Sequence, residues 1–251
     1  MRNFLLVNDD GFDSEGLRAL ADVLKELGKV YVCAPDTQQS GMSHSITLST
    51  SFEIEEREYP GAEKAWRVAG TPADCTKVGL QFCKELGVDI DIVYSGINKG
   101  SNLGTDTLYS GTVGAAMEAA INGVRGVAVS VNDHNASHFE TAAVLVRATL
   151  ERVLTDLTPS TVLNINTPNL PPEKVSGVRV TRLGPGYFDD HIVWEKGSRY
   201  KIVGEPPDYK RLGEGVDIAA NHMDCATLTT LKYDYTDIDG LKILDNWSIN
   251  I

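Results

Sequence analysis

Two adjacent carboxylates, Asp9 and Asp10, follow a short apolar run at residues 4–7, with only Asn8 between. An apolar run bounded by an Asn/Asp/Gly cluster is typical of a buried parallel strand, and open α/β sheets bind ligands beyond the carboxyl ends of such strands. Side-by-side carboxylates repel each other, and a bound cation or a shared proton relieves that repulsion. We therefore expect a metal ion here, while a helix N-cap followed by a turn residue is the simpler explanation of any single Asp-Asp pair.

A loop rich in hydroxyl groups, residues 35–45, is the second candidate. It follows a strand expected at residues 30–34 and should emerge at the same edge of the sheet as the two aspartates. Ser40 could offer an oxygen to a metal ion, and His44 could serve a leaving group or a phosphate. The alternative for either residue is a solvated polar loop.

Residues 96–104 form a stretch rich in glycine and asparagine after a strand expected at residues 90–95. Glycines of this density indicate a backbone that passes close to another group. Asn98 offers a neutral carbonyl oxygen to a hard cation, and Lys99 offers a local positive charge. This stretch is therefore a third candidate for the same site.

The run Ser110, Gly111 and Thr112 opens a further helix. Its hydroxyl groups, its free backbone N–H groups and the helix dipole, roughly half a positive charge, describe a phosphate cradle. It is not a Walker motif, because no Gly-Lys-Ser/Thr triplet follows the glycine-rich stretch. Close helix–sheet packing is an alternative explanation of the small residues at 114–120, but it does not explain the Asn/Gly stretch before them.

Alternating strands and helices must position these groups. Strands are expected at residues 4–7, 30–34, 90–95, 127–131 and 162–166, with short strands at 46–49 and 66–69 on either side of an exposed hairpin at 53–64. Helices are expected from Asp13 or Ser14 to Gly28, from a Thr71–Asp74 capping box to Gly87, from residue 110, and over residues 139–153. This alternation predicts an α/β fold with a mostly parallel sheet.

The pattern changes after a linker at residues 167–172. Beyond it we expect short strands without helices, at residues 177–182, 188–194, 199–204, 216–220 and 226–231. The run 188–204, with its aromatics and charged tip, cannot bury itself and resembles an arm that needs a partner surface. We therefore expect a catalytic domain at residues 1–170 and a β-rich oligomerisation region at residues 171–251.

The overall charge and the cysteines narrow the classes of partner and the compartment. The formal net charge of −12 argues against a polynucleotide partner and against an anionic membrane surface. The four cysteines lie in apolar runs without Cys-x-x-Cys spacing and are expected to be buried thiols in a reducing compartment. The first apolar run is too short for a signal peptide, and no apolar stretch approaches 18 residues. We expect a cytoplasmic protein with no membrane partner.

Five motifs, taken in this order, resemble the stationary-phase survival protein SurE family. They are Asn8–Gly11, Gln39–Gly41 with His44 and Ile46-Thr47, Gly70–Cys75, Ser95–Asn102 and Tyr109–Val113. The resemblance covers residues 1–170 well and continues more thinly into the tail. Ala120 stands where the family often has a glycine, which we read as conservative packing, and the 188–204 segment varies within the family.

The resemblance implies a metal-dependent 5′/3′-nucleotidase with a Rossmann-like, doubly wound sheet and a smaller C-terminal part used in forming dimers and tetramers. At the positions that match the family's motifs, the resemblance implies metal ligands at Asp9, Asp10, Ser40 and Asn98. It implies phosphate contacts at Asn98, Ser110, Gly111 and Thr112. Such an all-oxygen set suits Mg²⁺ or Mn²⁺, with Ca²⁺ as a structural occupant, and is poor for structural zinc.

The expected reaction is hydrolysis of nucleoside monophosphates, with activity on short polyphosphate as a side activity. We expect Asp9 or Asp10 to orient or deprotonate the attacking water. Two alternatives stay open: a non-catalytic nucleotide or phosphosugar sensor, and a phosphatase in which Asp9 attacks phosphorus. Three aromatics could stack a base, but core or interface packing is the expected role of each; they are Tyr109, Tyr187 and Trp194.

Overall fold

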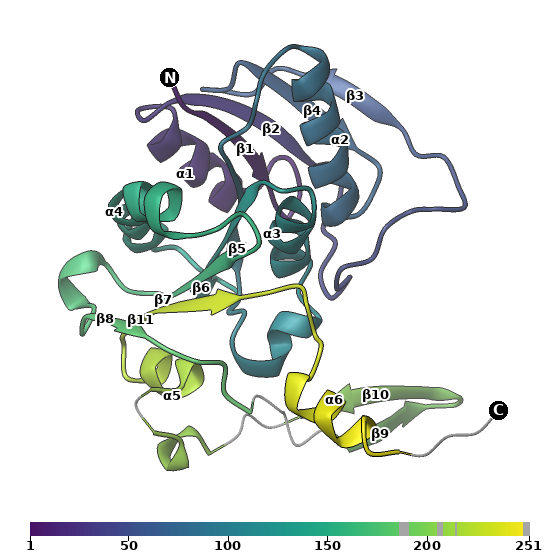
Figure 1. The fold of residues 1–251 in the computed structure, drawn as a ribbon, viewed down its shortest axis with the longest axis vertical. Helices are drawn as coiled ribbons and strands as arrows, with labels where there is room; N and C mark the ends of the chain where they lie inside the picture. Colours follow the sequence, from purple (N-terminus) through teal and green to yellow (C-terminus); the bar gives the residue numbers. More distant parts are fainter. Residues whose placement is uncertain (186–190, 205–207, 214, 248–251) are drawn as a thin grey trace.

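A mostly parallel, nine-stranded sheet forms the centre of the molecule in the order β3-β4-β2-β1-β5-β6-β7-β11-β8 (Figure 1). The computed structural model describes residues 1–185, 191–204, 208–213 and 215–247. The strands of this sheet are β1 (Asn3–Val7), β2 (Lys29–Pro35), β3 (Ile54–Arg57), β4 (Lys64–Val68), β5 (Ile92–Lys99), β6 (Arg125–Asn132), β7 (Val162–Pro168), β8 (Val178–Val180) and β11 (Ala226–Leu231). The pairs β3–β4 and β7–β11 are antiparallel, and the other neighbouring pairs are parallel.

Helices cover both faces of this sheet, as a doubly wound fold requires. They are α1 (Glu15–Leu24), α2 (Pro72–Glu85), α3 (Gly111–Ile121) and α4 (Glu140–Asp156). Successive side chains of β1 alternate between the faces, so Phe4 and Leu6 pack in the cluster that α1 and α4 cover, while Leu5 and Val7 pack in the cluster that α2 and α3 cover. The predicted α/β, Rossmann-like fold class is confirmed.

The starts of two predicted helices agree with their capping signals. The Ser14 side chain accepts a hydrogen bond from the backbone N–H of Leu17, which identifies Ser14 and not Asp13 as the N-cap of α1. At α2 the Thr71 side chain accepts from the N–H of Asp74, and the Asp74 carboxylate accepts from the N–H of Thr71. This reciprocal pair is the capping box that the sequence predicts.

Three local predictions are wrong. Residues 46–49, predicted as a strand, have no regular structure, although the hairpin that follows forms from β3 and β4. Part of the predicted loop 96–104 extends β5 as far as Lys99. Residues 217–220 of the strand predicted at 216–220 lie in a short helix, α5 (Asp217–His222), and the Asp217 carboxylate accepts from the backbone N–H of Ile218 at its start.

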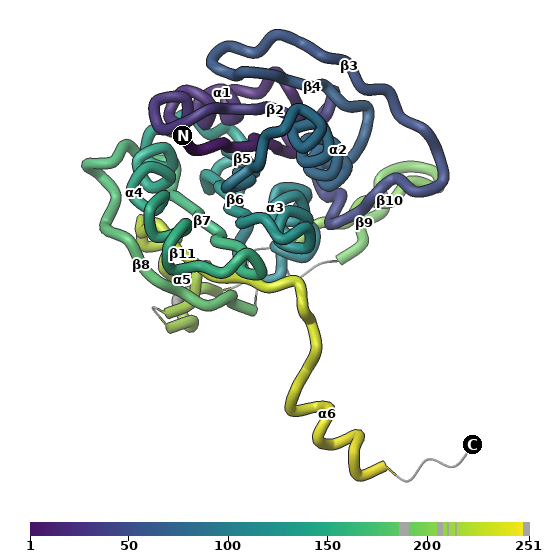
Figure 2. The backbone as a smooth tube through the Cα atoms, turned by 45° about the horizontal axis from the view of Figure 1, so that its top comes forward, coloured from purple at the N-terminus to yellow at the C-terminus, as the bar shows by residue number. Residues whose placement is uncertain are grey.

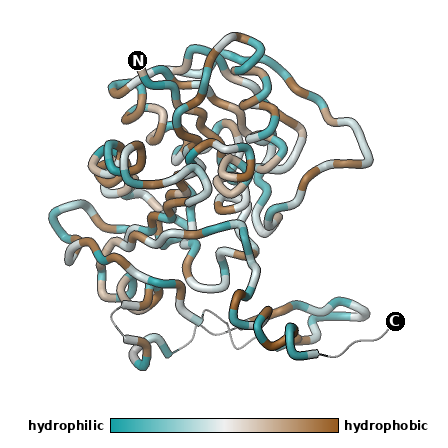
Figure 3. Tube along the Cα trace, viewed as in Figure 1, coloured by the Kyte–Doolittle hydropathy of each residue, from teal (hydrophilic) through white to brown (hydrophobic). Residues whose placement is uncertain are grey.

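The C-terminal part contains helices as well as strands. Strands β9 (His191–Lys196) and β10 (Arg199–Val203) pair in a separate two-stranded sheet, and β8 and β11 join the main sheet. After β11 the chain leaves the body of the molecule and ends in α6 (Ile238–Leu244) (Figure 2). Hydrophobic residues recur along α6 (Figure 3). The predicted strand start at residues 188–190 and Tyr187 lie outside the described residues.

Shorter 3₁₀ turns connect several of these elements: η1 (Gly104–Leu108), η2 (Pro172–Lys174) and η3 (Tyr209–Arg211). None of the helices in the described part of the chain combines the length and apolar character needed to cross a bilayer.

Candidate metal and phosphate site

The two adjacent aspartates lie at the carboxyl edge of the sheet, where β1 and β5 run side by side. The Asp10 carboxylate accepts a hydrogen bond of 3.0 Å from the backbone N–H of Lys99, the last residue of β5. This contact brings Asp10 to the strand end that carries Asn98. The hydrogen-bond partner of Asp10 therefore lies outside its own turn, so the capping of a nearby helix does not explain the aspartate pair.

Asp9 points to a different element, the N-terminus of α3. Its carboxylate accepts from the backbone N–H of Thr112 at 3.1 Å and from the Thr112 hydroxyl at 2.5 Å. A Cβ on Gly111 would lie 3.0 Å from the Cβ of Asp9 and 3.1 Å from its Oδ2, so a side chain at this position would push against the Asp9 carboxylate. Asp9 and Asp10 thus connect the predicted phosphate cradle with the Asn98 strand end.

Burial makes the ionised form of both carboxylates less favourable than it is in water. It raises the pKa of Asp9 from its ordinary 3.8 to about 6, although the hydrogen bond from the Thr112 hydroxyl opposes this and the charge of Asp10 adds to it. Burial also raises the pKa of Asp10, against the opposing effects of the Lys99 N–H and the Lys99 charge. A cation beside the pair would stabilise both charges.

Asn98 and Ser40 have oxygen atoms that other groups leave free. The Asn98 amide donates to the carbonyl of Gly100 at 2.7 Å, and within the described residues its own oxygen accepts no hydrogen bond. Ser40 is exposed, and its hydroxyl has no hydrogen-bond partner in the part of the chain that the structure describes. The preceding residue, Gln39, donates its backbone N–H to the carbonyl of Asp9 at 2.7 Å, so the residue next to Ser40 in the chain lies beside the aspartate pair.

The predicted phosphate cradle is a helix N-terminus with a buried cap. The Ser110 hydroxyl accepts from the N–H of Val113 at 3.1 Å, and its own hydrogen remains available to an anion. Thr112 uses both its N–H and its hydroxyl on Asp9. In this arrangement Thr112 orients the Asp9 carboxylate, while Ser110 and Gly111 have the hydrogen-bond donors that are left for a phosphate.

One neighbour of the site, His134, has no signal in the sequence. The ring of His134 lies against Gly100, since a Cβ on that glycine would be 3.0 Å from the imidazole, and His134 lowers the pKa of Asp10. The Lys99 ammonium, predicted as a local positive charge, forms an ion pair with Glu15 at 2.7 Å. His134 lies in a polar loop after β6, and only the folded chain brings that loop to Gly100.

The chemistry of these donors fits a hard divalent cation. Among the described residues no three His, Cys, Asp or Glu side chains gather to hold a metal ion. A metal at the aspartate pair would therefore also need the neutral oxygens of Asn98 and Ser40. Carboxylate, amide and hydroxyl oxygens are the ligands of Mg²⁺ or Mn²⁺, and not those of structural zinc.

Comparisons with known proteins agree with this geometry. A family model described as "Survival protein SurE" matches residues 4–190. A "5'-nucleotidase SurE" of Rubrobacter xylanophilus is 40% identical over 98% of this chain and 97% of its own length. Another from Vibrio cholerae is 39% identical over 97% of this chain and 96% of its own length. The crystal structure of the SurE protein from Aquifex aeolicus superposes with a TM-score of 0.84, at 35% identity, over 97% of this chain and 100% of that one. The resemblance predicted from five short motifs thus extends over almost the whole chain, which belongs to the SurE family.

Proposed function

We propose that this protein is a divalent-metal-dependent phosphomonoesterase that hydrolyses nucleoside 5′- and 3′-monophosphates to nucleoside and phosphate, with short polyphosphate as a side substrate. Its relatives in Rubrobacter xylanophilus and Vibrio cholerae are named as 5′-nucleotidases, which supports the nucleotidase activity. The observation that carries the proposal is the position of the aspartate pair, with Asp9 on the N-terminus of α3 and Asp10 on the strand end beside Asn98.

The residues divide into a metal-binding and a phosphate-binding group. Asp9, Asp10, Ser40 and Asn98 would hold Mg²⁺ or Mn²⁺, which supplies a polarised water and offsets charge in the transition state. Ser110 and Gly111 would donate to phosphate oxygens at the positive end of α3.

The aspartates have distinct roles in this proposal. Thr112 holds both oxygens of Asp9 in hydrogen bonds, which fixes the orientation of this carboxylate and makes it a poor nucleophile. This arrangement disfavours the aspartyl-phosphate alternative. Asp10, bonded through one oxygen to Lys99, is the better candidate to accept a proton from the attacking water.

Phosphate release from nucleoside 5′- and 3′-monophosphates and from short polyphosphate, with and without Mn²⁺ or Mg²⁺, tests the proposal. We expect turnover that EDTA abolishes and that falls at least about 100-fold in Asp9→Asn and in Asp10→Asn, because each removes a charge that binds the cation. Asp13→Asn, a change at an exposed carboxylate, is the matched control and should keep full activity. Binding of nucleotide without turnover would instead indicate a sensor, and activity that persists in Asp10→Asn would refute the site.

We further propose that the protein is a homodimer or homotetramer assembled through its C-terminal region. Helix α6 has its large apolar residues exposed, and it lies apart from the body of its own chain (Figure 2). Such a set of exposed apolar side chains on a short helix is typical of a surface that a partner covers. A second copy of this chain is the partner we propose.

A reducing compartment, and thus the cytoplasm, is the location we propose. All four cysteines are buried free thiols. Burial raises the pKa of Cys75 and Cys83, so neither is readily ionised at neutral pH. Buried thiols without disulfides are typical of proteins that stay in reducing surroundings.

A further inference from the structure

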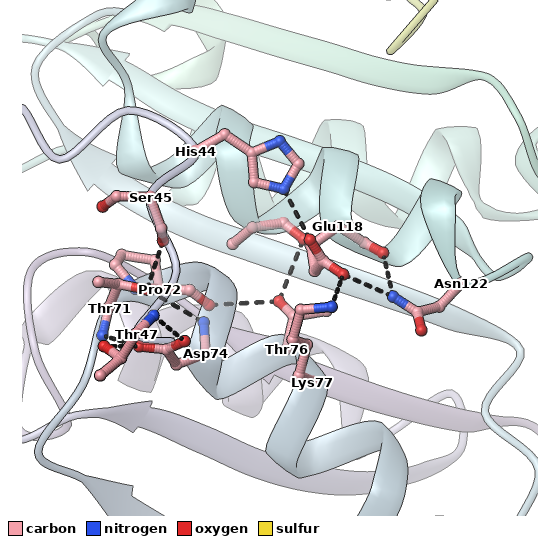
Figure 4. Close-up of polar contacts among 11 residues, drawn as sticks. His44, Ser45, Thr47, Thr71, Pro72, Asp74, Thr76, Lys77, Glu118 and Asn122 are labelled. Carbon is pink, nitrogen blue, oxygen red and sulfur yellow. Dashed lines mark hydrogen bonds and ion pairs between the residues drawn. The ribbon is translucent and has the colours of Figure 1, made fainter. Parts of the chain in front are cut away.

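Helix α3 carries one buried charge, Glu118, among small apolar residues. Only 3% of Glu118 is exposed, and its carboxylate has three side-chain partners (Figure 4). His44 Nε2 lies 2.8 Å from Oε2, while Lys77 Nζ and Asn122 Nδ2 each lie 2.7 Å from Oε1. Burying a carboxylate costs free energy unless hydrogen bonds satisfy it. The three partners supply those bonds and fix the orientation of the Glu118 side chain.

The three partners come from three places in the chain. Lys77 belongs to α2 and Asn122 follows the end of α3, while His44 belongs to the long segment between β2 and β3. Burial disfavours the charge on Glu118, but the hydrogen bonds from His44 and Lys77 outweigh it and lower its pKa. Glu118 is therefore an ionised anchor for His44 at neutral pH.

The segment around His44 lies directly on the backbone of α3. The N–H of Ser43 donates to the carbonyl of Tyr109 at 2.9 Å. A Cβ on Gly114 would be 2.6 Å from the carbonyl oxygen of Ser43, so only glycine permits this approach. Ser43 itself has a φ of 54°, a left-handed conformation that surrounding contacts must hold in place.

Ser40 lies between two fixed points of this segment. On one side Gln39 is bonded to the carbonyl of Asp9, and on the other Ser43 is bonded to the carbonyl of Tyr109 and His44 to Glu118 of α3. Ser40 makes no hydrogen bond of its own within the described residues. The position of Ser40 therefore depends on these neighbours, among which His44 contacts a charged group, the Glu118 carboxylate.

We propose that His44 is a positioning residue whose bond to Glu118 holds the Ser40 hydroxyl in place for the divalent cation. His44 does not touch the metal or the phosphate in this scheme. It acts through the chain between residues 40 and 44, and links the metal ligand Ser40 to the helix that begins with the phosphate cradle. The inference rests on the proposed function, because it takes Ser40 as a metal ligand.

A titration of the full chain with Mn²⁺ alone, monitored by the EPR signal of the free ion, measures the effect of His44 on metal affinity without turnover. We expect His44→Ala to raise the Kd for Mn²⁺ about 10-fold, the size of effect typical of residues that orient metal ligands. His44→Gln should restore most of the affinity, since its amide N–H can still donate to Glu118. Lys77→Met is the matched control, because it removes a partner of the same carboxylate without touching the Ser40 segment, and it should change the Kd less than twofold.

A double-mutant cycle with Ser40→Ala distinguishes positioning from general loosening of the fold. If His44 acts through Ser40, His44→Ala should have no further effect on Mn²⁺ affinity once the Ser40 hydroxyl is gone. Equal effects of His44→Ala in the two backgrounds would overturn the inference, as would an unchanged Kd or an equal loss in Lys77→Met. Circular dichroism of each variant shows whether it is folded, and His44→Gln provides the test if His44→Ala is not.

The same titrations separate this inference from the proposed function. Absence of Mn²⁺ binding to the unmodified protein would refute the metal site and the inference with it. Binding that is lost in Asp10→Asn but unaffected by His44→Ala would leave the metal site standing and refute the role of His44 alone.

Discussion

Asp9 is a buried carboxylate whose negative charge destabilises the metal-free protein. Because the pKa of Asp9 is about 6 in the folded chain and 3.8 in its ordinary state, the folded state binds a proton more tightly than the unfolded state. The charge on Asp9 therefore lowers the free energy of unfolding at pH 7, and this destabilisation disappears as the pH falls from about 6 towards 4. The same charge is what would attract the cation, so function and stability oppose each other at this residue.

We predict that Asp9→Asn stabilises the metal-free protein by about 1–3 kcal/mol at pH 7.5, with the gain shrinking below pH 6. The amide can accept from the Thr112 N–H and donate to its hydroxyl, so both contacts survive. Urea unfolding in EDTA at pH 7.5 and pH 5 measures the difference, with Asp13→Asn as the control. A variant less stable than the unmodified protein at pH 7.5 would contradict the prediction.

Local sequence signals predicted the aspartate pair and the start of α3, but not how they meet. Asp9 and Asp10 were recognisable because an apolar run ends at them, and Ser110–Thr112 because small hydroxyl residues precede a helix. The bond between Asp9 and Thr112 spans 103 residues, so the strand order decides it and no short pattern can. The same holds for His134 beside Gly100.

The N-terminus of α2 explains why residues 46–49 do not form the predicted strand. Asp74 of the capping box also accepts from the N–H of Thr47 at 3.0 Å and from its hydroxyl at 2.7 Å. The Thr71 hydroxyl donates to the carbonyl of Ser45 at 2.7 Å (Figure 4). These backbone groups bond to a helix end and not to a neighbouring strand, which the alternation of apolar and polar residues cannot reveal.

Asp74→Ala should destabilise the fold by about 2–3 kcal/mol, because it removes the cap and leaves the buried N–H of Thr71 and the half-buried donors of Thr47 unsatisfied. The free energy of unfolding in urea measures this loss. Asp89→Ala, at an exposed aspartate near the end of the same helix, should cost less than about 0.5 kcal/mol. Equal losses in the two variants would show that the Asp74 contacts contribute little.

Residues 216–220 show the opposite error, a strand predicted where a helix forms. A short run of mostly apolar residues was predicted as a strand here, yet its one polar residue, Asp217, is fully buried. Its carboxylate accepts from the N–H groups of Gly104 and Gly184, at 2.8 and 2.7 Å, and from that of Ile218. Two of these three backbone donors come from distant segments, so the buried Asp217 makes a tertiary interaction that overrides the local period.

The main sheet crosses the boundary predicted at residue 170, while the division into two functional parts stays a prediction. Strand β11 pairs with β7, and β8 lies beyond it, so the C-terminal region completes the sheet of the N-terminal one. The sequence predicted a strand at residues 226–231, which is β11, but could not assign its neighbour, because strand order follows from packing of the whole chain. After β11 the described part of the chain adds no further strand to this sheet.

Helix α6 is the segment on which we expect the assembly of the molecule to depend. Its apolar residues are exposed to between 46% and 63%; they are Ile238, Leu241, Ile243 and Leu244. Such a short, exposed helix is marginal in water unless another surface covers it. A second copy of the chain supplies that surface in our proposal.

We predict that the protein elutes with the mass of a dimer or tetramer and that Leu241→Glu lowers this mass. The charge would have to be buried against the partner, which disfavours association by several kcal/mol. Light scattering after size-exclusion chromatography measures the mass at a series of concentrations. Lys242→Glu introduces the same side chain at the adjacent position of α6, on a residue paired with Asp239 at the surface, and should leave the assembly intact. An unmodified protein that is monomeric at every concentration would refute this role for α6, and equal dissociation by both variants would show that charge, and not the apolar face, controls it.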